Sequence, residues 1–304
     1  MKGCGKILNG GVLAILLACA ISMMGCTADG DPVSIDPIIV SSSTSKGVKS
    51  SASVSSSSQG ESSSSEENAL DDFQKMVSVP ESRLIRGSAT YGVSAFKIGA
   101  TEVTQKLYFD VVGSLPDQPM VGDSLPVVGV NWYEAVLFCN ELSKKVGLDT
   151  AYVYASLGDE SYLENLTIDY SVAAVRLPTE TEWEIAARAG TTTTYYWDVA
   201  EASKYANYGQ INKSPVKVAS FIPNAFGLYD MGGNAAEWVN DWFGSYPTAS
   251  VENFAGASKG TTRCVRGGSW ADKVTALASS ERSSKDPLYS SAMLGFRIVY
   301  SSGF

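Results

Sequence analysis

The side chains that could carry chemistry in this chain are carboxylates and a few thiols, because the 304-residue sequence contains no histidine. That absence excludes an imidazole general base, a histidine-ligated zinc or iron ion, and a serine–histidine pair. Five cysteines are present, and two of them, Cys139 and Cys264, lie far from the N-terminus. These two could form one disulfide in an oxidising compartment, and the sequence leaves that pairing open.

The N-terminus carries the pattern of an export signal. Lys2 and Lys6 precede an apolar run over residues 12–24, which is shorter than the ~20 residues that span a bilayer. The run ends in a glycine directly before Cys26, and this ending resembles the lipobox of bacterial lipoproteins. We predict a lipoprotein signal peptide over residues 1–25 and a lipid on Cys26, which would anchor the chain to a membrane of a bacterial cell envelope. Ordinary cleavage nearby, releasing a secreted protein, is the alternative.

A serine-rich segment follows the predicted anchor. Fifteen of the residues from 41 to 65 are serine, and so little apolar surface cannot offset the entropy cost of folding. Residues 26–70 are therefore predicted to be a lipidated, disordered linker, and residues 71–304 to form one folded domain. The formal net charge of −9 counts against a nucleic-acid partner, whose phosphates require lysine and arginine.

Few regular elements are available to position the side chains of the folded domain. Alternating and apolar runs predict strands at residues 76–80 and 96–98, and a buried extended stretch at residues 126–130. After residue 190 we expect mostly loops and short strands. The predicted helices are 102–112, one capped by Asn131 that runs to about Val146, and one that begins at Thr179 and ends near Gly190; Glu134 and Glu182 would complete capping boxes in the last two.

Six sequence blocks give the strongest indication of the fold. They are Glu102-Val103-Thr104; Pro126 to Trp132 continuing to Cys139-Asn140; Arg176 to Glu184 with Ala186-Ala187-Arg188; Pro223 to Met231 with Gly233-Asn234 and Glu237-Trp238; Arg266 to Trp270; and Gly295-Phe296-Arg297. In order and spacing these blocks resemble the formylglycine-generating enzyme family, also called the sulfatase-modifying factor domain. The resemblance runs from about Met76 to Tyr300. It implies an α+β, C-type-lectin-like fold with few helices, short strands and much irregular loop.

Most residues in these blocks also have a structural interpretation. Three tryptophans are expected in the core, where each would bury a large area. Four arginines lie among apolar residues and would need carboxylate or carbonyl partners if buried, and four glutamates could supply some of them. The tryptophans are Trp183, Trp238 and Trp270; the arginines are Arg176, Arg188, Arg266 and Arg297; the glutamates are Glu180, Glu182, Glu184 and Glu237.

The resemblance also indicates what the chain lacks. The family's enzymes oxidise a cysteine of a target protein with two cysteines of their own, which bind copper just after the Gly-Gly-Ser-aromatic block. Aligned on those glycines, Asp272 and Leu277 stand at the two cysteine positions. No copper is therefore expected, because copper chemistry of this kind requires soft thiolate ligands. Cys264 precedes the glycines and is interpreted as a core residue.

A structural calcium ion is the metal that the resemblance still allows. In the family such an ion lies at the Gly-Asn-x-x-Glu-Trp block, and the matching positions here are Asp230, Gly233, Ala235 and Glu237. Two carboxylates and two backbone carbonyls are hard oxygen donors suited to calcium. The alternative is that Glu237 pairs with an arginine and that no ion binds.

Three functions remain open at this point. The first is a non-catalytic, lipid-anchored binding or scaffold module, with an unknown envelope protein or glycan as partner. The segment 148–175, which holds four tyrosines, could line its groove. The second is an enzyme that uses Asp272, Glu281 and Asp286 for acid–base chemistry. The third is an oxidoreductase of the formylglycine-generating type that acts on a protein cysteine.

Overall fold

The computed structural model describes residue 71 and residues 73–304. The predicted signal peptide (1–25), the predicted lipid attachment at Cys26 and the predicted serine-rich linker (26–70) lie outside the described residues. Within the described part of the chain, no helix is both long and apolar enough to cross a membrane.

Among the described residues, the three predicted α-helices form, and two of them begin at the predicted capping residues. Helix α3 (Trp132–Lys145) and helix α4 (Glu180–Arg188) each begin with a complete capping box, in which the N-cap side chain and a glutamate three residues later satisfy each other's backbone N–H groups. Helix α2 (Gln105–Val112) begins later than predicted, because the Thr104 side chain caps it by accepting from the Leu107 N–H. The preceding Val103 is extended and bonds to the backbone of Phe296 and Val127.

The largest sheet joins strands that are far apart in the sequence. Its members are β1 (Met76–Val79), β4 (Phe96–Gly99), β5 (Asp149–Thr150), β10 (Ala174–Arg176) and β16 (Val299–Ser301). They run in the order β1-β4-β16-β10-β5, so the strand at the C-terminal end lies near the centre. Strands β1 and β4 confirm the two predicted strands. The predicted buried, extended stretch at 126–130 is buried except at Gly129, but it forms no strand: Pro126 makes an isolated bridge with Thr104, and Gly129 adopts a positive φ of 74°.

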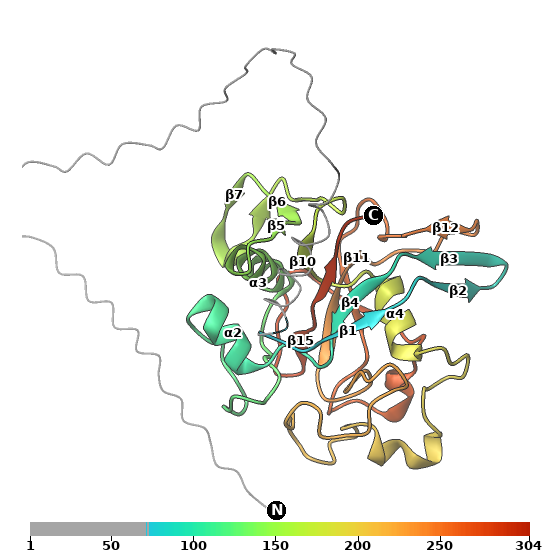
Figure 1. Cartoon of the computed structure of the whole chain (residues 1–304). Helices are drawn as coiled ribbons and strands as arrows, with labels where there is room; N and C mark the ends of the chain where they lie inside the picture. The colour runs from blue at the N-terminus through green and yellow to red at the C-terminus, as the bar shows by residue number, and fades with distance from the viewer. Residues whose placement is uncertain (1–70, 72) are drawn as a thin grey trace, which may run out of the picture. The chain divides into compact units, whose positions relative to one another are not determined.

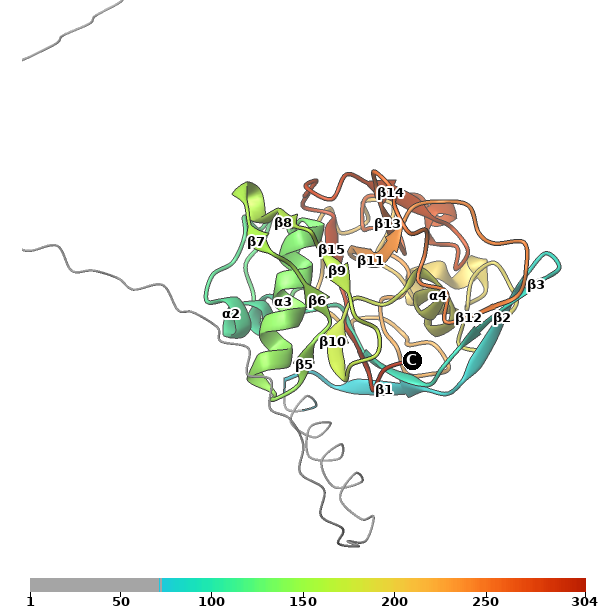
Figure 2. The same cartoon turned by 90° about the horizontal axis from the view of Figure 1, so that it is seen from above.

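A second sheet carries the residues of the later sequence blocks. It is formed by β11 (Ala236–Trp242), β13 (Arg263–Arg266), β14 (Ser283–Lys285) and β15 (Leu294–Phe296), in the order β14-β13-β11-β15. Glu237 of β11 pairs with Arg266 in the antiparallel direction and with Gly295 in the parallel direction. Figures 1 and 2 show α3 and α4 on opposite sides of β10, β11 and β15.

Smaller pieces complete the described region. Strand β3 (Ala89–Val93) pairs with β2 (Ser82–Arg86) and with β12 (Val251–Glu252). Two short ladders lie in the segment after α3: β6 (Tyr152–Val153) with β9 (Thr167–Ile168), and β7 (Ser156–Leu157) with β8 (Leu163–Glu164).

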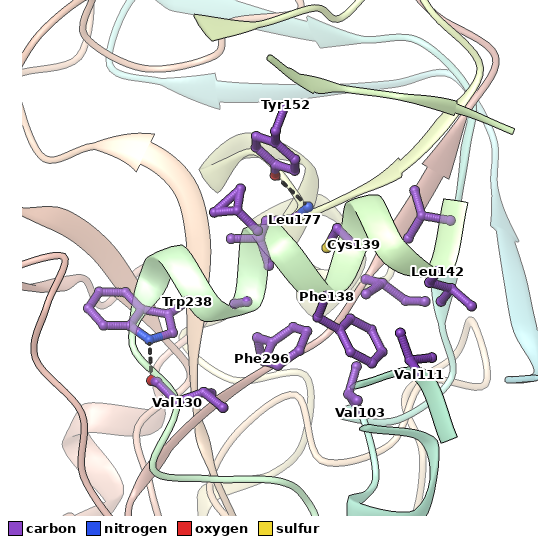
Figure 3. Close-up of a cluster of buried hydrophobic side chains, with 14 of the residues drawn as sticks. Val103, Val111, Val130, Phe138, Cys139, Leu142, Tyr152, Leu177, Trp238 and Phe296 are labelled. Carbon is purple, nitrogen blue, oxygen red and sulfur yellow. Dashed lines mark hydrogen bonds between the residues drawn. The ribbon is translucent and has the colours of Figure 1, made fainter. Parts of the chain in front are cut away.

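The main core lies between α2, α3 and the two large sheets. Phe138, Cys139 and Leu142 on one face of α3 contact this core together with Phe296 (Figure 3). The Trp238 indole N–H donates to the Val130 carbonyl at 3.0 Å, so the tryptophan is both packed and hydrogen-bonded.

The expectation that three tryptophans are buried holds for two of them. Trp183 and Trp238 are fully buried. Trp270 is only partly buried, because it follows the Gly267-Gly268 turn onto an irregular surface segment; its indole N–H reaches the Ala292 carbonyl at 3.3 Å. The two cysteines of the described region, Cys139 and Cys264, are both buried and free.

Buried ion pairs hold the elements together, as the arginines and glutamates predicted. Arg297 binds the Glu237 carboxylate at 2.7–2.9 Å, and Arg176 binds Glu182 through two contacts of 2.7 Å. Further pairs converge on helix α4: Arg266 and Arg188 bind Glu184, and Arg282 binds Glu180. Arg297 also donates to the carbonyls of Gly99 and Tyr229. This one side chain therefore connects β4, β11 and the residue directly before Asp230 of the predicted calcium site.

Replacing Arg297 with methionine should lower the free energy of unfolding by about 3–5 kcal/mol, because Glu237 would remain buried without its counter-charge. Urea denaturation of the two proteins measures this difference. The control is Lys106→Met, which removes an exposed pair with Asp110 on α2 and should leave the stability close to wild type. A loss below about 1 kcal/mol in Arg297→Met would contradict the importance given to this pair.

Candidate functional site

The turn at Gly267-Gly268 shapes the first candidate site. Both glycines adopt a positive φ, at 86° and 66°, directly after strand β13. A Cβ atom on Gly268 would lie 3.0 Å from both the Ala276 carbonyl oxygen and the Leu277 side chain. The turn can therefore pass this close to the short 3-10 helix Val274–Leu277 only because residue 268 has no side chain.

A cavity of about 270 Å³ opens beside this turn. Its apolar floor comes from β11, β13 and the start of β15. Its polar wall holds side chains of both charge signs together with several serines. The charged lining residues are Asp272, Glu281, Arg282 and Lys285.

The two positions assigned to the family's cysteines lie in different surroundings. The Asp272 carboxylate lines the cavity and accepts from the Ser269 N–H at 2.9 Å and from the Ser269 hydroxyl at 2.6 Å. Leu277 is 2% exposed and packs in an apolar cluster with Trp197. One carboxylate and one leucine do not fit Cu(I), which requires soft ligands.

No thiol lines this cavity among the described residues. Cys264 lies on β13, where its sulfur is 3.5 Å from a Glu180 carboxylate oxygen. Burial, and then the negative charge of Glu180, raise the pKa of the Cys264 thiol far above its ordinary value. Because the thiolate is the reactive form, this cysteine is suited to packing and not to redox chemistry.

The three acids considered for acid–base chemistry are only partly brought together. Asp272 and Glu281 line the cavity. Asp286 is not among the lining residues, and its carboxylate accepts from the Leu288 N–H at 2.9 Å. Arg282, which does line the cavity, is already engaged by Glu180 at 2.6 and 2.8 Å.

The predicted calcium residues gather around Asn234, but Glu237 has another role. Both oxygens of Glu237 contact Arg297, and one also accepts from the Trp183 indole N–H at 2.7 Å. Gly233 donates its N–H to the Gly267 carbonyl at 3.0 Å, which ties the block to the glycine turn. One oxygen of Asp230 accepts from the Ala219 N–H at 2.7 Å.

A residue that the sequence interpretation did not select completes this cluster. Glu102 is fully buried and accepts from the Asn234 side-chain amide at 3.0 Å and from the Ala235 N–H at 3.3 Å. Burial, and next the charge of Asp230, raise the pKa of Glu102 well above its ordinary value. Burial likewise raises the pKa of Asp230 to about 6. Glu102 is the first residue of the first sequence block, and this was the only feature of the sequence that could have indicated a role at the site.

The cluster suits either a proton or a hard cation. The second oxygen of Glu102 and the second oxygen of Asp230 have no hydrogen-bond partner among the described residues. Burial of both carboxylates disfavours two bare charges, so the pair suits a shared proton or a cation, while the charge of Arg297 lowers both pKa values and opposes this effect in part. No three acidic, cysteine or histidine side chains form a metal-ligand set in residues 71 and 73–304, so calcium would also need the backbone carbonyls of Gly233 and Ala235. Calcium at this site stays a prediction.

The tyrosines of the segment 148–175 divide between core and surface. Tyr152 is buried, and its hydroxyl accepts from the Leu177 N–H (Figure 3). Tyr162 is exposed. Tyr170 lines a separate cavity, and its hydroxyl accepts from the Asn240 side chain at 2.6 Å. Tyr170 is thus the one of these three tyrosines that lines that cavity, and the groove for a partner stays a prediction.

Residues 59–302 match a known family, described as the sulfatase-modifying factor enzyme 1-like domain. The chain belongs to this family. The α+β, C-type-lectin-like fold that the six blocks predicted is thereby confirmed, together with the helices and short strands described above.

Three relatives illustrate the range of this family. The chain is 32% identical to the chaperone protein LppX of Paenibacillus barcinonensis over 210 residues, which cover 60% of this chain and 71% of that protein. It is 34% identical to the formylglycine-generating enzyme of Streptomyces coelicolor over 147 residues, 41% of this chain, and it spans 46% of that enzyme. The structure of Treponema denticola variable protein 1 superposes with a TM-score of 0.67 and 34% identity, over 74% of this chain and 94% of that one.

Millimolar calcium should raise the thermal midpoint of unfolding, because a ligand that binds only the native state stabilises that state. At a hundredfold excess of calcium over its Kd, the free energy of unfolding rises by about 2.7 kcal/mol. The rise should weaken below pH about 6, where Asp230 takes up a proton that competes with the ion. Differential scanning fluorimetry with and without a chelator measures both effects.

The matched variants for this measurement are Asp230→Asn and Asp272→Asn. The first keeps an acceptor for the Ala219 N–H and removes the charge, so it should abolish the response to calcium. The second removes a carboxylate from the separate cavity and should leave the response intact. An unchanged midpoint in the wild-type protein at pH 8 would show that the two acids hold a proton instead of calcium.

Proposed function

We propose that this protein is a non-catalytic binding or scaffold module of a bacterial cell envelope, held at a membrane by a lipid on Cys26. One observation carries the non-catalytic part. Of the two positions that match the family's cysteines, one is an aspartate that lines the cavity and is held by Ser269, and the other is a leucine buried in a separate apolar cluster; the buried ion pair of Arg297 with Glu237 is present. This arrangement supports a family framework that lacks the thiolate pair needed to bind copper.

The cavity beside Gly267-Gly268 supports a binding role. It combines an apolar floor with two negatively charged side chains, Asp272 and Glu281, and with the positively charged Lys285. Polar groups that converge beside an apolar surface are typical of a ligand site. The relative named chaperone protein LppX and the relative named variable protein 1 support functions other than formylglycine formation in this family. The ligand would be a segment of an envelope protein or a glycan.

The proposed anchor and linker explain how such a module would reach its partners. A flexible chain of about 45 residues has a root-mean-square reach of roughly 35–40 Å, which would hold the domain clear of a lipid surface. A stable hold on the membrane requires more than one acyl chain, since a single chain binds reversibly. Modification of Cys26 in the manner of bacterial lipoproteins would supply several.

We expect the chain from residue 27 to 304 to bind no Cu(I) and to leave a cysteine-bearing sulfatase peptide unchanged under oxygen, because no thiolate pair lines the cavity. Copper binding is measured by competition with a chromogenic chelator, and peptide conversion by mass spectrometry. The formylglycine-generating enzyme of Streptomyces coelicolor serves as the positive control. Conversion by this protein would favour the alternative, an oxidoreductase that acts on a protein cysteine, and would end the proposal of a non-catalytic module.

Metabolic labelling with a fatty acid tests the anchor. We expect the wild-type chain to incorporate label and to fractionate with membranes, and Cys26→Ser to lose both properties, because the acylated thiol is absent. Cys19→Ser is the matched control, since it changes a cysteine inside the predicted signal peptide and should label normally. Equal labelling of the wild type and Cys26→Ser would exclude the anchor and favour a secreted protein.

A further inference from the structure

A second cavity, of about 370 Å³, lies between the β6–β9 ladder and the segment before β13. It shares no lining residue with the cavity beside Gly267-Gly268. Its polar and aromatic lining comes from β9, β11, β13 and the loops next to them. The polar and aromatic lining residues are Thr167, Tyr170, Asn240, Trp242, Ser258 and Arg263.

Arg263 is a buried arginine whose acidic neighbour, the buried Asp241, acts on it electrostatically but forms no ion pair with it among the described residues. It is 4% exposed, and its guanidinium lies between two indole rings, 3.6 Å from the Trp132 centroid and 3.5 Å from the Trp242 centroid. No carboxylate in the described region forms an ion pair with it. Arg176, Arg266 and Arg297, which are equally buried, each bind a glutamate.

The donors of Arg263 are only partly used. One terminal nitrogen, Nη1, donates to the Asn240 carbonyl at 2.7 Å. The Nε–H is buried and has no hydrogen-bond partner among the described residues. Because the two indoles cover the faces of the guanidinium, an additional partner must approach its edge. Burial lowers the pKa of Arg263 to about 10, so the group is still charged at neutral pH.

The side chains of Asn240 and Tyr170 in this cavity are hydrogen-bonded to each other, and that of Asn240 also to Tyr152. The Asn240 side chain accepts from the Tyr152 hydroxyl at 3.2 Å and donates to the Tyr170 hydroxyl at 2.6 Å. No aspartate or glutamate is among the described lining residues, so Arg263 gives the cavity a positive charge in an acidic protein. A desolvated guanidinium edge with a free donor selects a planar anion, and a carboxylate matches it best.

We propose that this cavity binds the carboxylate group of a small acidic ligand, the size of one sugar acid or one acidic amino acid. The volume is at the lower end of the 300–1,000 Å³ that is usual for ligand pockets, which limits the ligand to about one such unit. Burial raises the pKa of the neighbouring Asp241 to about 8, so a ligand carboxylate at the edge of Arg263 would supply the bonded counter-charge that this acid does not provide at neutral pH. This site is additional to the proposed function and does not depend on it.

The test titrates the full chain, purified in detergent, with two matched pairs of probes: glucuronate against glucose, and N-acetylglutamate against N-acetylglutamine. Calorimetry measures the affinity, and tryptophan fluorescence reports on the cavity because Trp132 and Trp242 flank Arg263. We expect one of the acids to bind at least about tenfold more tightly than its neutral partner. The acid that binds identifies the source of the carboxylate, a sugar or an amino acid.

Two kinds of variant locate the binding. Arg263→Gln removes the charge and should abolish binding of the acid. Should that variant fail to fold, Ser258→Asp and Ser258→Asn decide the matter, because residue 258 is exposed at the edge of the cavity. The aspartate should weaken binding about tenfold by repulsion, and the asparagine should leave it unchanged. Equal affinity for acid and neutral probes, no saturable binding of either acid, or unchanged binding in Ser258→Asp would overturn the proposal.

Discussion

The ion pair between Arg297 and Glu237 is the interaction on which the rest of the described structure depends. Glu237 lies on β11 and holds the Trp183 indole of α4, while Arg297 follows β15 and binds carbonyls of Gly99 and Tyr229. One pair of charges therefore fixes a helix, two sheets and a turn relative to one another. Such a pair stabilises the fold only while both partners are present, because either charge alone would be buried without compensation.

This commitment of Glu237 changes the chemistry of the neighbouring block. A carboxylate whose two oxygens already contact a guanidinium is a weak candidate for a cation ligand. The acids of this block that form no ion pair among the described residues are instead Glu102 and Asp230, and each has one buried oxygen without a hydrogen-bond partner. The same block that resembles a calcium site thus divides into a structural half, at Glu237, and a titratable half, at Asp230.

Local features of the sequence predicted the helices well, and tertiary features were harder to predict. The capping boxes at Asn131 and Thr179 act within four residues, so the sequence alone locates the starts of α3 and α4. Strand β11 was not predicted, because its residues are buried on both faces and show no alternation of polar and apolar types. Glu237 and Asn240 of this strand bind partners that are distant in the sequence, and no local pattern reveals such partners.

The candidate sites show the same division. The types of residue that would pair, arginine with glutamate, followed from burial, but the individual pairs required the fold. Trp270 was expected in the core but is only partly buried, because the sequence does not show that the chain continues from the Gly267-Gly268 turn into an irregular segment. Glu102 and Arg263 were not selected, because what distinguishes each of them is a missing partner in space.

The two buried thiols have a further consequence. Cys139 lies on α3 and Cys264 on β13, and neither is linked to another residue. Secreted domains of small size often depend on disulfides for stability, but this core is large enough to be held by apolar packing and ion pairs. The stability of the folded domain should therefore not depend on the redox potential of its compartment. Its folding outside a cell would need no thiol oxidase or disulfide isomerase.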